Sequence, residues 1–441
     1  MLLREPLDMR TLTPPSPEIS VTPLWTAEHP LPEPSTAALP RQVDCAIIGA
    51  GYTGLAAARE TAAAGRSTLV LDSAGVGEGC SGRNGGQVAH SIKPTMEGLS
   101  ARFGRDLAFR ILQEGFAAMS SLRDLAGEPN VDIGWRPSGS YYGAHTRRHF
   151  DLICREADNQ PRGLEQRIEV VSRANQPAEI NTDFYHGGLI YRDDASVHPM
   201  RLLLTLYERA RSAGAAVIDH CPATSMQSSG NGYQLQTPRG VVSAEKVLIA
   251  TNGYTGLLSP WHRRRVIPVG SYQIATARLG ADQVRTLIPQ GRNIVDTRRV
   301  VVYFRPSPDG ERIIFGGRAA LAEKNPLLVV PRLRSMLAQI FPSLNSVAID
   351  HAWAGTVAFT FDKMAHLGRR GGIYYCMGYC GQGVPTAPYF GKRIGQQMAG
   401  LKEGATALDG LAFPTKPFYS GVPWFLAPSI LSYRILDALG V

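Results

Sequence analysis

A glycine-rich turn between an apolar strand and an Ala-rich helix constrains the fold of this chain most. Val43–Ile48 reads as a short buried strand, and the G-x-G-x-x-G run Gly49–Gly54 follows it directly. A helical stretch over Leu55–Ala64 comes next, and a second strand over Thr68–Asp72 ends on an acidic residue. This strand–turn–helix–strand context is the one that the dinucleotide-binding fingerprint requires. The sequence therefore predicts an α/β fold with a Rossmann-type unit near the N-terminus.

Each residue of this fingerprint has a physical task. Gly49 permits the tight turn, Gly51 lets the backbone approach a pyrophosphate, and Gly54 lets the helix pack close to the sheet. The N-terminus of this helix offers unpaired N–H groups and a positive dipole end to the phosphates. We expect Asp72, at the tip of the second strand, to accept hydrogen bonds from a ribose.

The same spacing occurs a second time in Gly77–Gly82. Arg83-Asn84-Gly85-Gly86 follows it, which is a poor helix start, and no apolar strand leads into it. We interpret this copy as a glycine-rich loop.

Composition sets broad limits on the class of protein. With 441 residues, 44% of them hydrophobic, the chain can bury a large core, and we expect two domains. Its six cysteines have neither C-x-x-C nor zinc spacing, which predicts no disulfide framework, no metal site and a cytoplasmic location. The first forty residues are rich in proline and contain no apolar run, so we expect no signal peptide.

The net charge of +9 raises the question of a nucleic-acid partner. Its densest cluster, Arg263–Arg265, is short and lacks interleaved aromatic residues, so we expect a solvated basic face and no nucleic acid. No run reaches the ~18 apolar residues of a membrane span. The apolar C-terminal tail lacks a basic polar face, so we expect it to pack on its own domain or on another subunit rather than on a membrane.

Nucleotide-binding elements recur late in the chain. Ile373–Met377 reads as a last strand, and a glycine-rich loop over Gly378–Gly383 leads into a helix that runs to about Met398. Residues 100–125 have helical periodicity, and His198 precedes a helix over Met200–Ala213. Strands dominate between these blocks, which predicts the following division: an N-terminal arm over 1–40, a discontinuous nucleotide-binding domain over 41–100, 190–260 and 350–400, a second β-rich domain over 101–189 and 261–349, and a tail over 401–441.

Several of these segments resemble a known family. The chain is similar to the D-amino-acid oxidase/glycine oxidase/sarcosine oxidase superfamily of flavoproteins, and within it to the γ-glutamylputrescine oxidase-like branch. The matching segments cover nearly the whole chain from Trp25 onward: Gly49–Gly54, Ser81–Gln87, Leu248–Tyr254, Phe304–Gly310, Phe315–Arg318, Trp353–Gly355 and Gly378–Gly383.

The resemblance implies an FAD-binding domain interrupted by a β-sheet substrate domain. It implies oxidation of the C–N bond of an amine or amino acid by hydride transfer to flavin, followed by hydrolysis of the imine. We expect O2 to be the electron acceptor and H2O2 a product. Two alternatives stay open: a dehydrogenase that passes electrons to a quinone or carrier protein, and a flavin-binding assembly protein without turnover.

The resemblance also assigns cofactor contacts residue by residue. Gly355 stands where sarcosine oxidases attach flavin through a cysteine, which predicts non-covalent FAD. Gln382 stands where the family often has histidine. The residues expected to bind FAD are Gly49, Gly51, Tyr52, Thr53, Gly54, Asp72, Ser73, Ser81, Gly82, Arg83, Asn84, Gly85, Gly86, Gln87, Ala223, Gly253, Gly381, Gln382, Gly383 and Val384.

Four side chains are candidates for work on the substrate: Arg305, His351, Lys363 and Tyr272. The resemblance places the segments of Arg305, His351 and Tyr272 over the reactive face of the flavin. Arg305 and Lys363 are candidates for holding a substrate carboxylate or for assisting the reaction of reduced flavin with O2. The net positive charge and Arg305 predict an acidic group on the substrate. Core packing is the alternative role for Tyr272, as for Tyr303 and Trp353.

Overall fold

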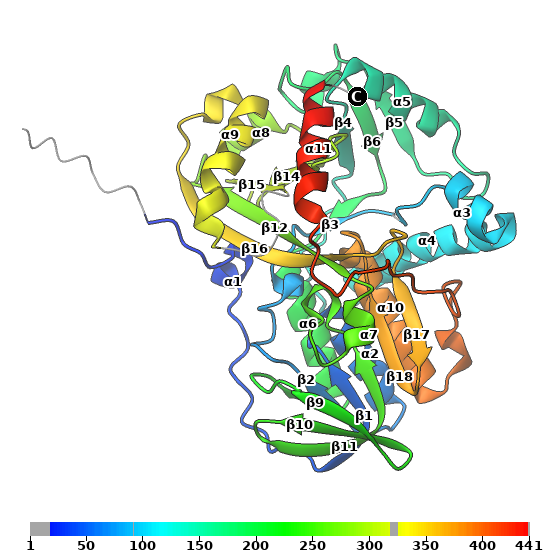
Figure 1. The fold of residues 1–441 in the computed structure, drawn as a ribbon. Coiled ribbons are helices and arrows are strands. Elements are labelled where there is room, and N and C mark those ends of the chain that lie inside the picture. Colours follow the sequence, from blue (N-terminus) through cyan, green and yellow to red (C-terminus); the bar gives the residue numbers. More distant parts are fainter. Residues whose placement is uncertain (1–17, 91, 318–324, 440–441) are drawn as a thin grey trace, which may run out of the picture.

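The computed structural model describes residues 18–90, 92–317 and 325–439. Arg318, the last residue of one of the segments that carry the resemblance, and the first 17 residues of the N-terminal arm lie outside these ranges. Two eight-stranded sheets organise the described residues, one in the lower and one in the upper half of Figure 1. We call the two halves the lower and upper lobes.

The sheet of the lower lobe has the strand order β17-β18-β11-β1-β2-β8, and β10 and β9 extend it from β11. β1 pairs in parallel with both β11 and β2, so the fingerprint strand lies at the centre. The apolar run of this strand is buried, as a strand covered on both faces requires. The strands of this sheet are β1 (Gln42–Ile48), β2 (Thr68–Leu71), β8 (Ala216–Ile218), β9 (Ser225–Ser229), β10 (Gly232–Thr237), β11 (Gly240–Ile249), β17 (His366–Arg370) and β18 (Ile373–Met377).

Three long helices pack in the lower lobe: α2 (Tyr52–Ala63), α6 (Pro199–Ser212) and α10 (Gly383–Ala399). His198 accepts a hydrogen bond from the Arg201 N–H and caps α6, which confirms the expected helix start. The helical periodicity of residues 100–125 is confirmed, and two helices share this region. Gly104 adopts φ +81° and divides this region into α3 (Met96–Phe103) and α4 (Arg105–Gly127).

The sheet of the upper lobe has the strand order β16-β12-β15-β14-β13-β4-β6-β5. Its strands are β4 (Ser140–Gly143), β5 (Ile168–Val171), β6 (Gly188–Tyr191), β12 (Ile267–Thr276), β13 (Asn293–Asp296), β14 (Val302–Pro306), β15 (Ile313–Gly317) and β16 (Ile349–Phe359). The sequence division assigned residues 350–359 to the nucleotide-binding domain. They instead form an edge strand of the upper sheet, because β16 pairs antiparallel with β12 along nearly its whole length.

The remaining elements connect or cover the two sheets. β3 (Gln87–Val88) and β7 (Ala195–Ser196) form a small separate sheet. The other helices are α1 (Leu24–Glu28), α5 (Arg147–Asp158), α7 (Pro260–Arg263), α8 (Ala281–Leu287), α9 (Val330–Ile340) and α11 (Leu426–Leu439). Short 3-10 helices are η1 (Cys80–Gly82), η2 (Gln176–Ala178), η3 (Asn252–Tyr254), η4 (Pro326–Val329), η5 (Pro342–Leu344) and η6 (Lys402–Gly404).

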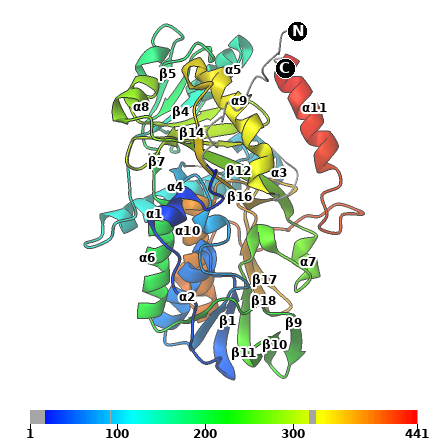
Figure 2. The same cartoon turned by 90° about the vertical axis from the view of Figure 1, so that its left-hand side faces the viewer.

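Both ends of the described chain cross from one lobe to the other. The arm, residues 18–41, begins beside β16, where the Ser20 N–H donates to the Asp350 carbonyl at 2.9 Å. It passes through α1 at the level where the lobes meet and descends to β1 (Figure 2). At the other end, α11 lies against the upper lobe, where the Asp437 carboxylate accepts hydrogen bonds from the Arg299 and Val300 N–H groups. The tail thus packs on its own chain.

Candidate functional site

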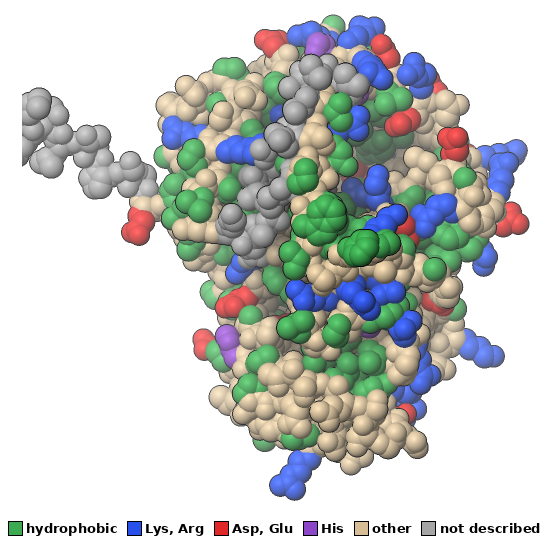
Figure 3. Space-filling model, viewed as in Figure 1, with side chains coloured by type: hydrophobic (Ala, Val, Ile, Leu, Met, Phe, Trp, Pro, Cys, Tyr) green, Lys and Arg blue, Asp and Glu red, His purple; other side chains and the backbone are tan. Residues whose placement is uncertain are grey.

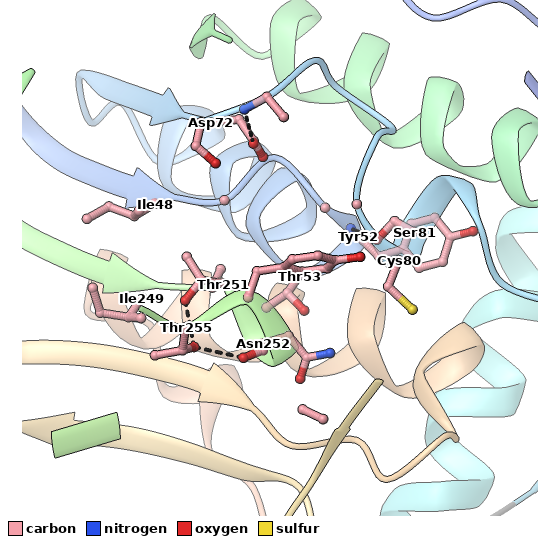
Figure 4. A pocket seen from close by; sticks show the side chains of 18 of the residues that line it. Ile48, Tyr52, Thr53, Asp72, Cys80, Ser81, Ile249, Thr251, Asn252 and Thr255 are labelled. Atoms are coloured by element: carbon pink, nitrogen blue, oxygen red, sulfur yellow. Dashed lines mark hydrogen bonds between the residues drawn. The ribbon is translucent and has the colours of Figure 1, made fainter. Parts of the chain in front are cut away.

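A cavity of about 600 Å³ lies at the carboxyl ends of the parallel strands of the lower sheet (Figure 4). Ligands of doubly wound α/β folds bind at this edge. Many of the residues expected to bind FAD line it: Gly49, Gly51, Tyr52, Thr53, Asp72, Ser73, Ser81, Arg83, Asn84, Ala223, Gly381, Gly383 and Val384.

The fingerprint turn leaves no room for side chains. A Cβ on Gly54 would lie 1.9 Å from the Gly49 carbonyl oxygen, because α2 starts directly against the turn. A Cβ on Gly51 would lie 2.9 Å from Ser81 Oγ, which already accepts a hydrogen bond from the Tyr52 N–H at 3.1 Å. The close approach of backbone to ligand that the motif predicts is therefore available here.

Asp72 both lines the cavity and ties the turn together. Its carboxylate accepts hydrogen bonds from the Ala50 N–H at 2.6 Å and from the Ala74 N–H at 3.0 Å. Burial raises the pKa of this carboxyl above its ordinary value, although the backbone donors oppose the shift. A mutation here would disturb the turn as well as any ribose contact.

Two helices begin at the cavity without a side-chain cap from their own N-cap residues, and Ser81 Oγ accepts only the Tyr52 N–H at the start of α2. Gly51 is the N-cap residue of α2 and Gln382 that of α10, and neither residue makes a side-chain cap bond. The N–H groups of a first helical turn have no partner within the helix, so both starts favour an anion. Thr53 Oγ1 and the Tyr379 hydroxyl, 2.5 Å apart, join the two starts. Burial raises the pKa of Tyr379 well above its ordinary value, so its hydroxyl keeps its proton.

A densely bonded segment bounds the other end of the cavity. We call it the Arg83 loop, residues Ser81–Gln87. The Arg83 carbonyl accepts hydrogen bonds from Gln273 Nε2 at 2.6 Å and from Trp353 Nε1 at 3.0 Å. Asn84 Nδ2 donates to the Tyr52 hydroxyl and to the Ser81 carbonyl. This end is therefore shaped by side chains that come from both lobes.

Other predicted cofactor residues lie outside the described lining of the cavity. Gln87 Nε2 donates to the Phe304 carbonyl at 3.2 Å, so this side chain joins the Arg83 loop to β14. Gly85 faces the ring of Tyr303. The residues of this group are Gly54, Gly82, Gly85, Gly86, Gln87, Gly253 and Gln382.

The four substrate candidates lie outside the described lining of this cavity. Tyr272 is fully buried in the core of the upper lobe. His351 Nδ1 donates to the Thr22 carbonyl at 3.0 Å, on the side of β16 where the arm passes. Lys363 is exposed in a turn with φ +62°. Successive residues of a strand face opposite sides, and the sequence could not say which side faces the cavity.

Arg305 is buried rather than open to the cavity. Only 4% of the residue is exposed, its Nη2 donates to the Val197 carbonyl at 2.8 Å, and its guanidinium lies 5.1 Å from the centre of the Trp25 ring. Burial lowers the pKa of Arg305 to about 9. Arg305 thus lies outside the described lining of this cavity, and its contact with the substrate stays a prediction. Its contacts join β14 to the segment before α6 and to the arm.

Sequence reasoning missed several lining residues. Thr251, Asn252 and Thr255 form a polar wall after β11, and Thr251 Oγ1 lies 2.7 Å from Thr255 Oγ1 (Figure 4). Their position just beyond the carboxyl end of a buried strand was a usable signal, since that edge carries the ligand. Tyr379 and Cys80 also line the cavity. Each lies within a glycine-rich segment that the sequence did single out, Gly77–Gly82 for Cys80 and Gly378–Gly383 for Tyr379.

The turn, the two helix starts and the strand-end cavity define a dinucleotide-binding α/β protein. The family described as FAD dependent oxidoreductase (DAO) matches residues 44–397, and the chain belongs to this family. It is 32% identical over 384 residues to the probable oxidoreductase OrdL of Rhizobium meliloti (strain 1021), covering 86% of this chain and 88% of that protein. It is 30% identical over 408 residues to the gamma-glutamylputrescine oxidoreductase of Escherichia coli (strain K12), covering 90% of this chain and 93% of that protein.

The fold agrees with a solved structure at lower sequence identity. Glycine oxidase from Geobacillus kaustophilus superimposes with a TM-score of 0.69 at 20% identity, over 86% of this chain and 99% of that one. The family, the Rossmann-type fold class and the FAD cofactor expected from the sequence are thereby confirmed. The chain is an FAD-dependent oxidoreductase, which removes the alternative of a protein without turnover. Among the described helices, none is long and apolar enough to cross a membrane.

The cavity fits this cofactor. A Cβ on Gly381 would meet no atom within 4 Å, so the space beside this residue is open. The start of α2 would hold the phosphates and Asp72 the adenosine ribose. The start of α10 would face N1 and the C2 carbonyl of the flavin ring, and the Arg83 loop would surround that ring. Backbone donors, a carboxylate and a polar loop are the donor set that such a dinucleotide requires.

Proposed function

We propose that this enzyme oxidises the C–N bond of a small amine or amino acid, giving an imine that water hydrolyses to a carbonyl compound and an amine. Dioxygen is the final electron acceptor and hydrogen peroxide the second product. When bound, FAD supplies the acceptor for the substrate hydride. The observation that carries the proposal is the cavity itself, which combines two uncapped helix starts with the Arg83 loop. The names of the gamma-glutamylputrescine oxidoreductase and the glycine oxidases support the substrate class.

The chain's own residues bind and orient rather than attack. Gly381 and Gly383 line the cavity where α10 begins, so backbone N–H groups there favour negative charge. Arg83 adds a guanidinium to the lining and donates to the Ala354 carbonyl at 3.1 Å. The substrate must bind as its neutral amine, because a protonated amine does not release hydride readily. Such chemistry requires no protein nucleophile.

The decisive experiment is anaerobic mixing of the holoenzyme with candidate substrates. Primary amines, N-methyl amino acids, D-amino acids and aminophosphonates are each tested for loss of the flavin absorbance. At least one class should bleach the flavin, and no bleaching by any of them would contradict the proposed substrate class. Admitting air to the reduced enzyme then tests the acceptor. Reoxidation much slower than turnover would contradict the use of dioxygen.

We propose that FAD is held without a covalent bond. Gly355 provides no side chain for attachment, and a Cβ there would lie 3.7 Å from Cys80 Sγ. The thiol of Cys80 therefore lies beside the position that the sequence comparison singled out. Acid precipitation should release the yellow chromophore into the supernatant. Colour that stays with the pellet would contradict the proposal, and the mass of a Cys80→Ser variant would show whether Cys80 is the link.

A second candidate is a dehydrogenase that passes electrons to a quinone or a carrier protein. The observation that favours it is the exposed apolar surface of the tail, where Phe418 is 96% and Trp424 67% exposed. Figure 3 shows apolar side chains gathered in the middle of this face, with lysine and arginine side chains beside them. The reoxidation experiment separates this candidate from the oxidase, because a dehydrogenase would need an added acceptor.

An acidic group on the substrate remains part of the proposal. It is supported by Arg83 in the cavity, by the net charge of +9 and by the γ-glutamyl group in the name of one relative. Comparing an acidic amine with an uncharged one of the same length tests it. We also propose a cytoplasmic location, supported by six cysteines among which the structure forms no disulfide. Cell fractionation checks this location.

A further inference from the structure

One indole from the N-terminal arm reaches the Arg83 loop. Trp25, in α1, is fully buried, and its Nε1 donates to the Asn84 carbonyl at 2.8 Å. The family match begins at residue 44, so Trp25 comes from a segment outside it. The arm is therefore a candidate part of the cofactor site that the family comparison does not cover.

Two tryptophans donate hydrogen bonds to neighbouring carbonyls of the Arg83 loop. Trp353 Nε1 donates to the Arg83 carbonyl at 3.0 Å, next to the bond from Trp25 to Asn84. The two indole rings meet edge to face, with centroids 6.1 Å apart. The Arg305 guanidinium packs on the Trp25 ring at 5.1 Å. Trp25 is thus fixed in orientation by residues of the upper lobe while it bonds to a loop of the cavity.

The arm is anchored on both sides of Trp25. Before it, the Ala352 N–H donates to the Ser20 carbonyl at 2.9 Å and joins the arm to β16. After it, Glu28 Oε2 lies 2.9 Å from His198 Nε2, and the buried ring of His198 lies 5.1 Å from that of Trp25. Burial lowers the pKa of His198 below its ordinary value, so the neutral ring donates this bond at neutral pH.

We propose that Trp25 is a positioning residue for FAD, which acts by fixing the Asn84 carbonyl and thereby the Arg83 loop. The Asn84 side chain links the Tyr52 hydroxyl, the Ser81 carbonyl and the Gly86 N–H. Movement of its backbone would shift all three contacts, together with Arg83 in the cavity lining. The proposal rests on the proposed placement of the flavin ring against this loop.

The test variant is Trp25→Phe, which keeps an aromatic ring and removes only the N–H donor and part of the ring. Trp424→Phe is the matched control, because Trp424 is largely exposed. FAD is titrated into each apoprotein and its fluorescence is followed, and the visible spectrum of each holoprotein is recorded. Loss of one donor to a buried carbonyl predicts FAD binding weaker by about five- to thirtyfold and a shifted flavin spectrum. The control should match the wild type within about twofold.

Wild-type FAD affinity and spectrum in Trp25→Phe would overturn the proposal. Asn84→Ala separates this failure from a failure of the flavin placement. If Asn84→Ala weakens FAD binding and Trp25→Phe does not, the arm has no positioning role although the loop contacts the cofactor. If neither variant changes FAD binding, the loop does not contact the cofactor and both proposals fail.

Glu28→Ala carries the test if Trp25→Phe does not fold. Glu28 is partly exposed and anchors α1 through His198, so its loss should loosen Trp25 with little effect on the core. We expect FAD binding weaker by about two- to fivefold and a spectral shift in the same direction. Unchanged affinity and spectrum in Glu28→Ala would overturn the proposal.

Discussion

The two ends of the cavity are built in different ways. The fingerprint end is formed by backbone between Ile48 and Ala74, and its shape depends on the absence of side chains at Gly51 and Gly54. The Arg83 loop end is held by donors from Trp25, Gln273 and Trp353, which come from three distant segments. The fingerprint end is formed by one short segment of the chain. The Arg83 loop end forms only when both lobes and the arm have assembled.

This difference suggests a division of labour. Phosphates and ribose are common to all dinucleotides, and a backbone turn with helix starts can bind them in many proteins. The reactive ring needs surroundings specific to its chemistry, and side chains from several segments can supply these. We therefore expect mutations at the fingerprint end to abolish FAD binding and mutations at the Arg83 loop end to tune it.

The largest expected effect is that of Gly51→Leu. A Cβ at this position would already lie 2.9 Å from Ser81 Oγ, and a longer side chain would fill the approach to the helix start. The purified variant should contain no flavin, as measured by absorbance at 450 nm relative to 280 nm. Gly127→Leu is the control, because a Cβ there meets no atom within 4 Å and the residue is exposed. Flavin content equal to the control would show that the fingerprint end tolerates side chains.

Tyr379→Phe should weaken FAD binding less than Gly51→Leu does, because it removes only the link between the starts of α2 and α10. The variant leaves the Thr53 hydroxyl, 2.5 Å from the lost oxygen, without this partner between the starts of α2 and α10. Loss of one buried hydrogen bond should destabilise the protein by about 1–3 kcal/mol, lower its thermal midpoint and weaken FAD binding. Tyr433→Phe, at an exposed position, is the control for the change itself. An unchanged midpoint and unchanged affinity would mean that the two helix starts are not coupled through this pair.

A third prediction concerns the pH dependence of the protein's stability, to which His262 in α7 contributes. His262 is buried, lies 2.5 Å from Ser259 Oγ through its Nδ1, and its pKa is lowered to about 3 by burial, with Arg265 and Arg370 adding to the shift. In the unfolded chain this ring binds a proton below about pH 6.5, whereas the folded ring stays neutral. The stability that the neutral His262 ring contributes to the folded protein is therefore present above pH 6.5 and is lost as the pH falls from 6.5 toward 3.

The His262 prediction is tested by thermal midpoints measured at pH 7, 6 and 5. The wild type should lose stability over this range, and His262→Gln should lose less of it. His220→Gln is the control, because the side chain of His220 is 53% exposed. Equal losses in the wild type and His262→Gln would show that His262 does not contribute to the pH dependence.

The smallest effect is expected for Arg305→Met. The buried guanidinium lies on Trp25 and bonds to the Val197 carbonyl, so we expect FAD affinity to change by about twofold. The ratio of kcat/KM for an acidic and an uncharged amine should not change. A changed ratio would show that Arg305 reaches the substrate after all, and the two ends of the cavity would then differ less than we propose.

The sequence could predict the parts of the fold and site that depend on local backbone, and not those that depend on contacts between distant segments. The β1–α2–β2 unit and the β18–α10 unit were legible because glycine spacing and apolar runs report local backbone requirements. The places of Arg305, Tyr272 and His351 were not legible, because the facing of a strand residue depends on register and partner strands. The bond from Trp25 to the Asn84 carbonyl was not legible either, since the two residues lie 59 positions apart along the chain.

The bond between Thr53 and Tyr379 has a consequence for how the protein is made. These residues are 326 positions apart, so the starts of α2 and α10 come together at the cavity only after most of the chain has left the ribosome. Until then β11 lacks β18 as its neighbour, and a parallel strand edge stays open. Long-range pairing of this kind slows folding. The nascent chain therefore has a long interval in which the open edge of β11 can pair with another chain and aggregate.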